Sequence, residues 1–324
     1  MAVQDVEQPA VLRFPDPEVD GYHQCWYAVA MSDEVAVGQV VGKEFLNGRV
    51  VVWRGDDGVA RVHSAYCRHM GADLALGDVD GCVLRCEFHH WEYGTDGRCS
   101  KIPVQDHIPE RARLFTFPTE ERFGLIWAFN GEQPLYELPA FPTIATDDIV
   151  SRVFQTETLP VPPYVILSNT HDFQHVAVMH GATMEHEPTQ FDIQPYTIEF
   201  ENQVHDPTIG ETQQHFKIFG TNTLTLANQT GPITLLSLFT ATPINDGLTT
   251  GYTVTGTHKS APDPDKIIDH GEHFARTIME DDNPVLKTMR FKPDTPIAVD
   301  LPLMRWFRRA SEFPAAHPAR ELIS

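Results

Sequence analysis

The sequence predicts an α+β protein in which an all-β domain comes first and a domain with an antiparallel sheet and helices follows. Two observations lead to this prediction. Residues 22–130 alternate short strand-like runs with turns, and longer strand-like runs follow between residues 215 and 257. A helical pattern then covers residues 265–287. The chain of 324 residues is long enough for two such cores.

The first half contains a hairpin pattern and ends in a connector. The expected strands cover residues 49–53, 59–65 and 124–129. The turn at residues 55–58 separates the first two strands, and a connector interrupted by proline follows at residues 131–142. We therefore expect one domain over residues 20–135 and a second over residues 136–324.

The second half predicts an antiparallel meander followed by a helix. The expected strands cover residues 215–219, 222–228, 233–240 and 249–257. Turn residues such as Gly220 and the pair Gly231-Pro232 separate these strands. Pro284 is expected to kink or break the helix at residues 265–287 near its end.

The composition excludes several classes of protein. The chain is 41% hydrophobic and 21% charged, as in globular proteins, and its formal net charge of -21 argues against a nucleic-acid partner. No apolar run approaches the ~20 residues of a membrane span, and residues 1–9 lack the pattern of a signal peptide. Five cysteines do not suggest a disulfide framework, so a cytoplasmic location is expected.

Two short motifs carry pairs of cysteine and histidine. The first pair is Cys67 and His69 and the second is Cys86 and His89, with sixteen residues between the pairs. Each pair offers one thiolate and one imidazole. Together they can hold a [2Fe-2S] cluster of the Rieske type, in which both cysteines bind one iron and both histidines bind the other. The spacing therefore predicts an electron-transfer cluster.

A zinc site with two cysteines and two histidines is the alternative. The surroundings favour the cluster, because each motif follows a strand-like run and small residues such as Gly71 and Gly97 come after the motifs. The other cysteines, Cys25, Cys82 and Cys99, are expected to be packing thiols.

A second group of candidate ligands lies in residues 169–180. Asp172 and His175 are three residues apart and share a helix face. His180 is five residues after His175, about 140° around an ideal helix, so the helix must end or bend there if both histidines are to reach one metal. His171 and His175 can equally be a metal pair or unrelated. Two histidines and one carboxylate, with open positions, are typical of non-haem Fe(II) oxygenases.

The third ligand is expected from the helix at residues 265–287. Its apolar stripe consists of Phe274, Ile278, Val285 and Met289. Asp282 lies about 40° from Ile278 around the helix, inside the stripe, and Asp281 lies about 60° to the other side. A buried ionised carboxylate is costly unless it is paired or binds a metal. Asp282 is therefore the expected ligand, Asp281 is the second choice, and Glu280 points almost the opposite way.

The chain resembles the Rieske non-haem iron oxygenases, specifically their catalytic α subunits, over nearly its whole length. The motif C-x-H-x16-C-x-x-H is present. The motif N-x-x-D-x-x-H-x4-H corresponds to Asn169, Asp172, His175 and His180, and Asp282 lies where the family places its carboxylate.

The residues around the two cluster motifs resemble a subgroup. The segments AYCRHMGADL, from Ala65, and CEFHHW, from Cys86, are closest to the oxygenase component of 3-ketosteroid 9α-hydroxylases and to cholesterol-desaturase-like enzymes. The departures from the commoner family pattern are Arg68, Met70, Glu87, His90 and Ser168. They leave the cluster ligands in place.

The resemblance implies a Rieske-type β domain followed by a helix-grip (START-like) catalytic domain over an apolar pocket. It implies mononuclear Fe(II) bound by His175, His180 and Asp282. It also implies a trimer in which the cluster of one subunit faces the iron of the next. Asp172 resembles the family's bridging aspartate, which accepts hydrogen bonds from His175 and from a cluster histidine of the neighbour. Asn169 belongs to the same motif.

The implied function is that of a terminal oxygenase component that uses O2 to monooxygenate a hydrophobic small molecule, with a steroid-like compound as one candidate. Electrons come from a separate ferredoxin or ferredoxin reductase, so NAD(P)H acts only indirectly. This agrees with the absence of a G-x-G-x-x-G motif from the sequence. Dealkylation, desaturation and aromatic dihydroxylation are alternatives. A Rieske electron carrier and a binding protein without metal are alternatives from other classes. A homotrimer is the default assembly.

Overall fold

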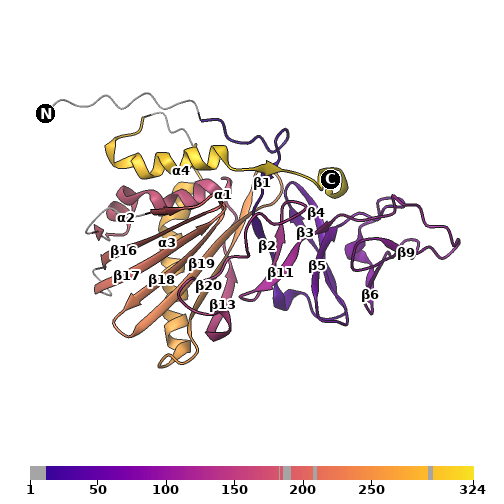
Figure 1. Ribbon diagram of the computed structural model, residues 1–324, viewed down its shortest axis with the longest axis horizontal. Coiled ribbons are helices and arrows are strands. Elements are labelled where there is room, and N and C mark those ends of the chain that lie inside the picture. Colours follow the sequence, from indigo (N-terminus) through magenta and orange to yellow (C-terminus); the bar gives the residue numbers. More distant parts are fainter. Residues whose placement is uncertain (1–11, 182, 185–190, 207–209, 291–294) are drawn as a thin grey trace.

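The chain folds into two adjoining parts that are both rich in β-structure (Figure 1). The computed structural model describes residues 12–181, 183–184, 191–206, 210–290 and 295–324. Residues 1–9, which the sequence analysis considered for a signal peptide, lie outside the described residues. The predicted α+β class is confirmed, because strands form the first part and a large sheet with helices forms the second.

The first part is built from two small sheets and a smaller group of strands that carries the cysteine and histidine loops. The sheet with order β10-β5-β4-β3 and the sheet with order β11-β12-β2 form its body. The strands are β2 Trp26–Met31, β3 Val40–Phe45, β4 Gly48–Arg54, β5 Ala60–Ser64, β10 Thr116–Phe117, β11 Thr119–Arg122 and β12 Leu125–Phe129. The smaller group contains β6 Asp78–Asp80, β7 Val83–Arg85, β8 Glu92–Tyr93 and β9 Cys99–Lys101.

The second part is organised around one large antiparallel sheet. Its strand order is β13-β20-β19-β18-β17-β16-β14, with β15 paired to β16. The strands are β13 Ile149–Gln155, β14 Thr183–Met184, β15 Phe191–Ile193, β16 Thr197–Asp206, β17 Gly210–Phe219, β18 Thr223–Thr230, β19 Ile233–Pro243 and β20 Thr249–His258. The predicted meander is therefore confirmed, and its strands extend further than expected.

The two faces of this sheet have different partners. Leu236, Leu238 and Val254 point to one face and pack against Trp26 and Trp127 of the first part. Because side chains alternate along a strand, their neighbours face the other way, toward the helices. The helices and the remaining short strands are α1 Pro163–Ile166, α2 Phe173–Met179, α3 Pro264–Leu286, α4 Leu301–Glu312, α5 Arg320–Ile323, β1 Tyr22–His23 and β21 Ala315–Ala316.

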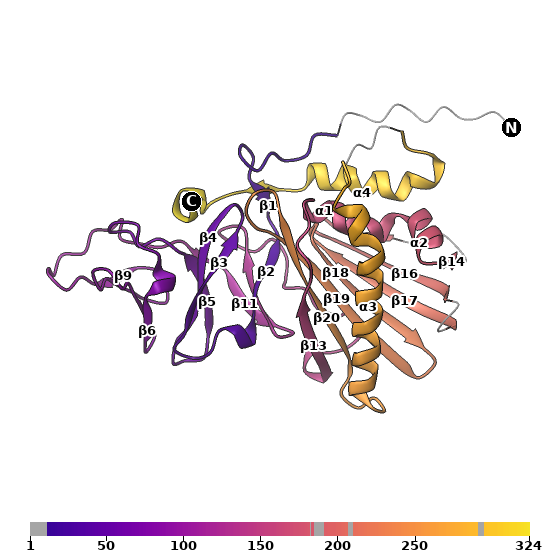
Figure 2. The same cartoon turned by 180° about the vertical axis from the view of Figure 1, so that it is seen from behind.

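Helix α3 lies across the sheet face (Figure 2). A glycine makes close contact possible, because a Cβ at Gly271 would lie 2.5 Å from Leu235 Cδ1 of β19. The helix buries Asp282 but leaves Phe274 and Val285 of the predicted stripe 39% and 46% exposed, and Met289 lies beyond the end of the helix. α3 continues through Pro284 and ends two residues later, at Leu286, so it does not break at Pro284 itself, and the alternative of a kink there stays a prediction.

The C-terminal segment returns to the first part of the chain. β21 pairs with β1, and Phe313, Ala319 and Ile323 belong to the core that Val50 and Val62 share. The division into residues 20–135 and 136–324 stays a prediction, and the final residues pack with the earlier unit. None of the helices in the described ranges combines the length and apolar character that crossing a bilayer requires.

We predict that His171→Phe makes the protein less sensitive to acid. His171 stacks on Trp306 at 4.7 Å, and burial lowers its pKa from 6.5 to about 3. The unfolded chain therefore binds a proton below about pH 6.5 that the native chain refuses, which costs about 1.4 kcal/mol of stability by pH 5.5.

Phenylalanine keeps the stacking and cannot be protonated. We therefore subtract the urea midpoint of the unchanged protein from that of the variant at each pH. This difference should be larger at pH 5.5 than at pH 8. A difference that is equal at both pH values would contradict this account.

Candidate metal centres

The two cysteine and histidine motifs lie in paired loops of similar shape. One loop follows β5 and the other connects β7 to β8. Each is closed by a backbone hydrogen bond to the cysteine carbonyl, from Gly71 N–H to Cys67 and from His90 N–H to Cys86, both at 2.9 Å. Gly71 and His90 have φ of 77° and 56°. His90, a departure from the family pattern, therefore occupies a left-handed position that ordinarily favours glycine.

The loops bury their sulfurs and expose their imidazoles. Cys67 and Cys86 are 4% and 1% exposed, whereas His69 and His89 are exposed at the surface. The two imidazole rings lie 4.5 Å apart at 72° to each other. Two inner thiols and two outer imidazoles fit a Rieske cluster whose histidine-bound iron lies at the surface.

Aromatic side chains hold these groups in place. His69 stacks on Trp91 at 4.7 Å. The Tyr93 hydroxyl accepts a hydrogen bond from the Arg68 N–H at 3.0 Å and lies 3.2 Å from Cys67 Sγ, to which it can donate. Sequence reasoning missed Tyr93, since a tyrosine in a strand gives no signal of such a contact.

The buried thiols are suited to bind a metal rather than to remain free anions. Burial is the largest cause that raises the pKa of Cys67, and the neighbouring Cys86 raises it further. A thiolate here needs a compensating positive charge. Iron supplies that charge and replaces the thiol protons when it binds.

A second centre forms where a short helix ends. Asp172 begins α2, and its Oδ1 accepts a hydrogen bond from the His175 N–H at 2.9 Å. The helix stops at Met179, and Gly181 follows with φ of 66°. The predicted end of the helix near His180 is therefore confirmed, and it turns His180 back toward His175.

His175, His180 and Asp282 bring three ligand atoms together. Asp282 Oδ1 lies 3.0 Å from His175 Nε2 and 3.2 Å from His180 Nε2, and the two nitrogens are 3.1 Å apart. The groups form a set that can hold a metal ion. Two imidazole nitrogens and a carboxylate that face one point fit a cation, because their lone pairs otherwise repel each other.

The carboxylate of Asp282 is also held from outside the set. Asn169 Nδ2 donates to Asp282 Oδ2 at 3.0 Å, which leaves Oδ1 for the two histidines. The Asp282 side chain is 11% exposed, and in the described part of the chain no lysine or arginine pairs with it. Its hydrogen bond is the main cause that raises the pKa of His175.

The other candidates in this region take different places. His171 lies in the core against Trp306 rather than with the triad. Asp281, the second choice, approaches only the outer nitrogen of His180, at 3.7 Å. Asp172 contacts the backbone of His175, and its expected hydrogen bond to the His175 ring is not formed among the described residues.

The two groups of candidate ligands lie toward opposite ends of the folded molecule. The strands β6 to β9, which flank the cluster loops, form one extremity, and α2 lies toward the other in both views (Figures 1 and 2). The two groups of candidate ligands are therefore well separated within one copy of the chain (Figures 1 and 2).

A mostly apolar cavity of about 220 Å³ adjoins the triad. Asn169 and Asp282 are among the residues that line it. Its walls come from α3 and from the sheet face below, and include Leu224, Leu226, Phe239, Phe274, Ile278 and Met279. A hydrophobic molecule placed there can reach the metal-binding atoms.

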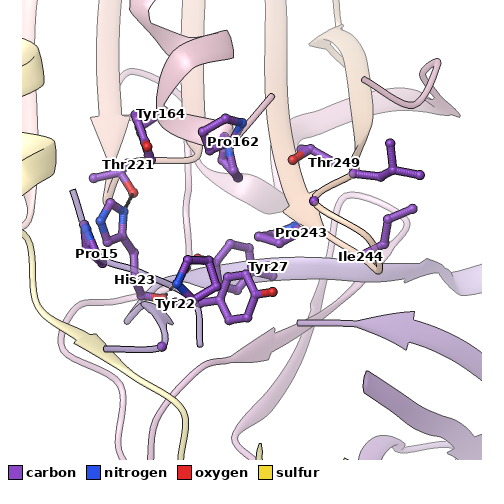
Figure 3. Close-up of a pocket in the computed structure, with 15 residues that line it drawn as sticks. Pro15, Tyr22, His23, Tyr27, Pro162, Tyr164, Thr221, Pro243, Ile244 and Thr249 are labelled. Carbon is purple, nitrogen blue, oxygen red and sulfur yellow. Dashed lines mark hydrogen bonds between the residues drawn. The ribbon is translucent and has the colours of Figure 1, made fainter. Parts of the chain in front are cut away.

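A separate cavity of about 250 Å³ lies where the two parts of the chain meet (Figure 3). Prolines and tyrosines line it, together with His23, whose Nδ1 is 2.6 Å from Thr221 Oγ1. Burial lowers the pKa of His23 to about 4. None of the candidate ligands lines this cavity, so we assign it no part in the chemistry.

Comparisons with known proteins agree with this geometry. The family model of the Rieske [2Fe-2S] domain matches residues 25–118. A cholesterol 7-desaturase of Bombyx mori is 36% identical over 53% of this chain and 38% of its own length. A 3-ketosteroid-9-alpha-monooxygenase oxygenase component of Mycobacterium tuberculosis is 33% identical over 39% of this chain and 34% of its own length. The chain thus spans little more than a third of these relatives.

Solved structures extend the likeness to the whole fold. Dicamba monooxygenase bound to dicamba has a TM-score of 0.73 at 16% identity, covering 90% of this chain and 96% of its own. NdmA of Pseudomonas putida CBB5 has a TM-score of 0.70 at 18% identity, covering 90% and 94%. The predicted β domain and the antiparallel sheet domain that follows it are confirmed, and so is the resemblance to Rieske oxygenases, whose matched relatives include proteins named for steroid substrates.

We predict that Asp282→Ala removes the metal bound by the triad and leaves the cluster intact. Iron analysis should give about three iron atoms per chain in the unchanged protein and about two in the variant. Asp281→Ala is the matched control and should keep about three. Equal iron contents in all three proteins would exclude Asp282 as a ligand.

Proposed function

Starting from a Rieske [2Fe-2S] domain at residues 25–118 and the fold of the Rieske oxygenases, we propose that the chain is a terminal oxygenase component. It uses O2 and electrons from a ferredoxin or ferredoxin reductase to hydroxylate a hydrophobic small molecule. One observation carries the proposal: the triad of His175, His180 and Asp282 adjoins an apolar cavity in a chain that also carries a cluster domain.

The donor set of the triad fits a mononuclear Fe(II). Two imidazoles and one carboxylate on one side of the ion leave positions open, and iron held in this way supplies the activation of O2. Asn169 keeps Asp282 from rotating, since it holds Oδ2 at 3.0 Å. The apolar walls of the cavity exclude water from the reacting carbon.

We assign Asp172 the role of joining the two centres between subunits. Its Oδ1 is occupied by the His175 N–H, and the carboxylate makes no other hydrogen bond in the described part of the chain. Oδ2 is therefore available to an imidazole N–H of His69 or His89 from a neighbouring copy, both of which are exposed. The separation of the centres within one chain supports a homotrimer with this contact.

The substrate is a neutral apolar molecule, with steroid-like compounds as candidates. The relatives named 3-ketosteroid-9-alpha-monooxygenase and cholesterol 7-desaturase support this class. Desaturation and N-dealkylation remain alternatives on the same machinery, since a chloroacetanilide N-alkylformylase oxygenase component is 32% identical over 50% of this chain. None of the five cysteines forms a disulfide, and Cys25, Cys82 and Cys99 lie outside the cluster motifs, which supports a cytoplasmic location.

Oxygen uptake tests the function against a pure electron carrier. With a surrogate ferredoxin reductase and NADH, the iron-loaded protein should consume O2 in a manner that depends on an added apolar substrate and release an oxygenated product. The cluster of the Asp282→Ala variant should still be reduced. The variant should form no oxygenated product and show no O2 uptake that depends on the substrate. Reduction of the cluster without product, for every apolar substrate tried, would favour the electron carrier.

We predict that Asp172→Asn nearly abolishes turnover while both metal centres stay loaded. Asparagine is a good N-cap, so α2 should keep its first turn. The substitution removes only the negative charge and one of the two acceptor oxygens. Iron content and the cluster spectrum should match those of the unchanged protein. Turnover equal to that of the unchanged protein would exclude the joining role of Asp172.

A further inference from the structure

One end of the apolar cavity carries a polar side chain that the oxygenase chemistry does not use. Strand register places Leu226 opposite Ser237 and Asn228 opposite Leu235. Leu224, Leu226 and Asn228 alternate along β18 and therefore share the sheet face that α3 covers. Asn228 is only 7% exposed and lines the cavity.

The amide of Asn228 is oriented by its neighbour on β17. Gln214 lies opposite Asn228, and its Nε2 donates to Asn228 Oδ1 at 2.9 Å. Because that bond fixes the amide oxygen, the Nδ2 donors point the other way. None of the hydrogen bonds among the described residues uses Nδ2, and Nδ2 is not one of their fully enclosed unpaired atoms, so this donor is open to the cavity. A ligand oxygen inside an apolar cavity has few other donors, so it gains by accepting a hydrogen bond from this amide.

Asn228 lies far from the metal-binding atoms along the cavity. It also lines a second cavity of about 520 Å³, together with Lys266 and His270 near the start of α3. Asp282 is twelve residues beyond His270 on the same helix, which is about 18 Å along the axis. A ligand that reaches both Asn228 and the triad must therefore be elongated.

The charges around the first cavity favour an uncharged ligand. The charged side chains among its described lining residues are Glu157 and Asp282, both acidic. Glu157 is paired with Lys287, and Asp282 belongs to the triad. An anionic ligand would meet no basic group on the walls of the first cavity, and Lys266 of the second cavity lines it together with the acidic Asp263. A carbonyl or ether oxygen needs only a donor.

We propose that Asn228 is a specificity-determining residue that binds an uncharged oxygen acceptor, such as a ketone, at the end of an elongated apolar substrate opposite the metal. Gln214 is its positioning residue. Ser237, a diagonal neighbour of Asn228 in the same cavity, offers its hydroxyl as a second donor to the same oxygen. The proposal names the substrate class of the proposed oxygenase and so rests on that function.

Binding of matched probes to the iron-loaded protein, without reductant, tests this directly. The probes are 4-phenylcyclohexanone, phenylcyclohexane and 4-phenylcyclohexane carboxylate, which share one skeleton and differ in the oxygen group. Calorimetric titration should show the ketone binding more tightly than the hydrocarbon and the carboxylate. Asn228→Leu should weaken binding of the ketone about tenfold and leave that of the hydrocarbon unchanged or slightly tighter.

Two further variants separate the hydrogen bond from a general change in the sheet. Asn202→Leu alters a buried amide on β16, directly opposite Gln214, that does not line the cavity, and should leave the affinity for all probes unchanged. Gln214→Leu should reduce the preference for the ketone over the hydrocarbon less than Asn228→Leu does, because the amide of Asn228 then remains but turns freely.

The outcomes are distinct from those that test the oxygenase. Equal loss of ketone and hydrocarbon affinity in Asn228→Leu, no loss at all, or tighter binding of the carboxylate than of the ketone would each overturn the proposal. These titrations need no turnover. If the ketone preference depends on Asn228 but no O2 is consumed, the proposed role of Asn228 is supported and the proposed oxygenase function is excluded.

Discussion

The structure depends on one electrostatic constraint: a buried carboxylate and two imidazole nitrogens face a common point. The three atoms lie 3.0 to 3.2 Å from one another, and in the described residues no lysine or arginine neutralises Asp282. Such an arrangement is stable only with a proton or a cation between the groups. The local fold around the site is best understood as the means of holding these atoms together.

Each element near the site contributes to that convergence. The end of α2 at Met179 turns His180 back, and the cap from Asp172 fixes the first turn that carries His175. The close approach at Gly271 brings α3 onto the sheet, so that Asp282 is buried and meets Asn169. The same approach shapes the cavity between helix and sheet, which gives the metal-binding atoms an apolar neighbour.

The cluster loops bury one kind of ligand and expose the other. Their thiols are buried and their imidazoles are exposed, so the histidine side of the cluster is available at the surface. The loops lie at the end of the folded molecule that is farther from α2 (Figure 1). An exposed imidazole pair at one end and a partly exposed Asp172 at the other fit an arrangement in which different copies of the chain supply the two centres.

The sequence alone determined the candidate ligands, because chemistry restricts metal ligands to few residue types at fixed spacings. Spacing predicted the four residues of the cluster motifs, which stay candidates. The structure brings His175 and His180 together with Asp282 rather than Asp281, and it contains the predicted antiparallel meander. The apolar stripe of α3 was predicted less well, since periodicity cannot tell which neighbour a helix face will have.

Only the tertiary structure decided which distant residues meet. The roles of Tyr93 beside Cys67, Asn169 on Asp282 and Asn228 at the far end of the cavity depend on strand register and on how closely α3 approaches the sheet. His171, one residue before Asp172, lies in the core because the turn before α2 points it inward. These placements arise from contacts between residues far apart in the chain, for which local spacing carries no information.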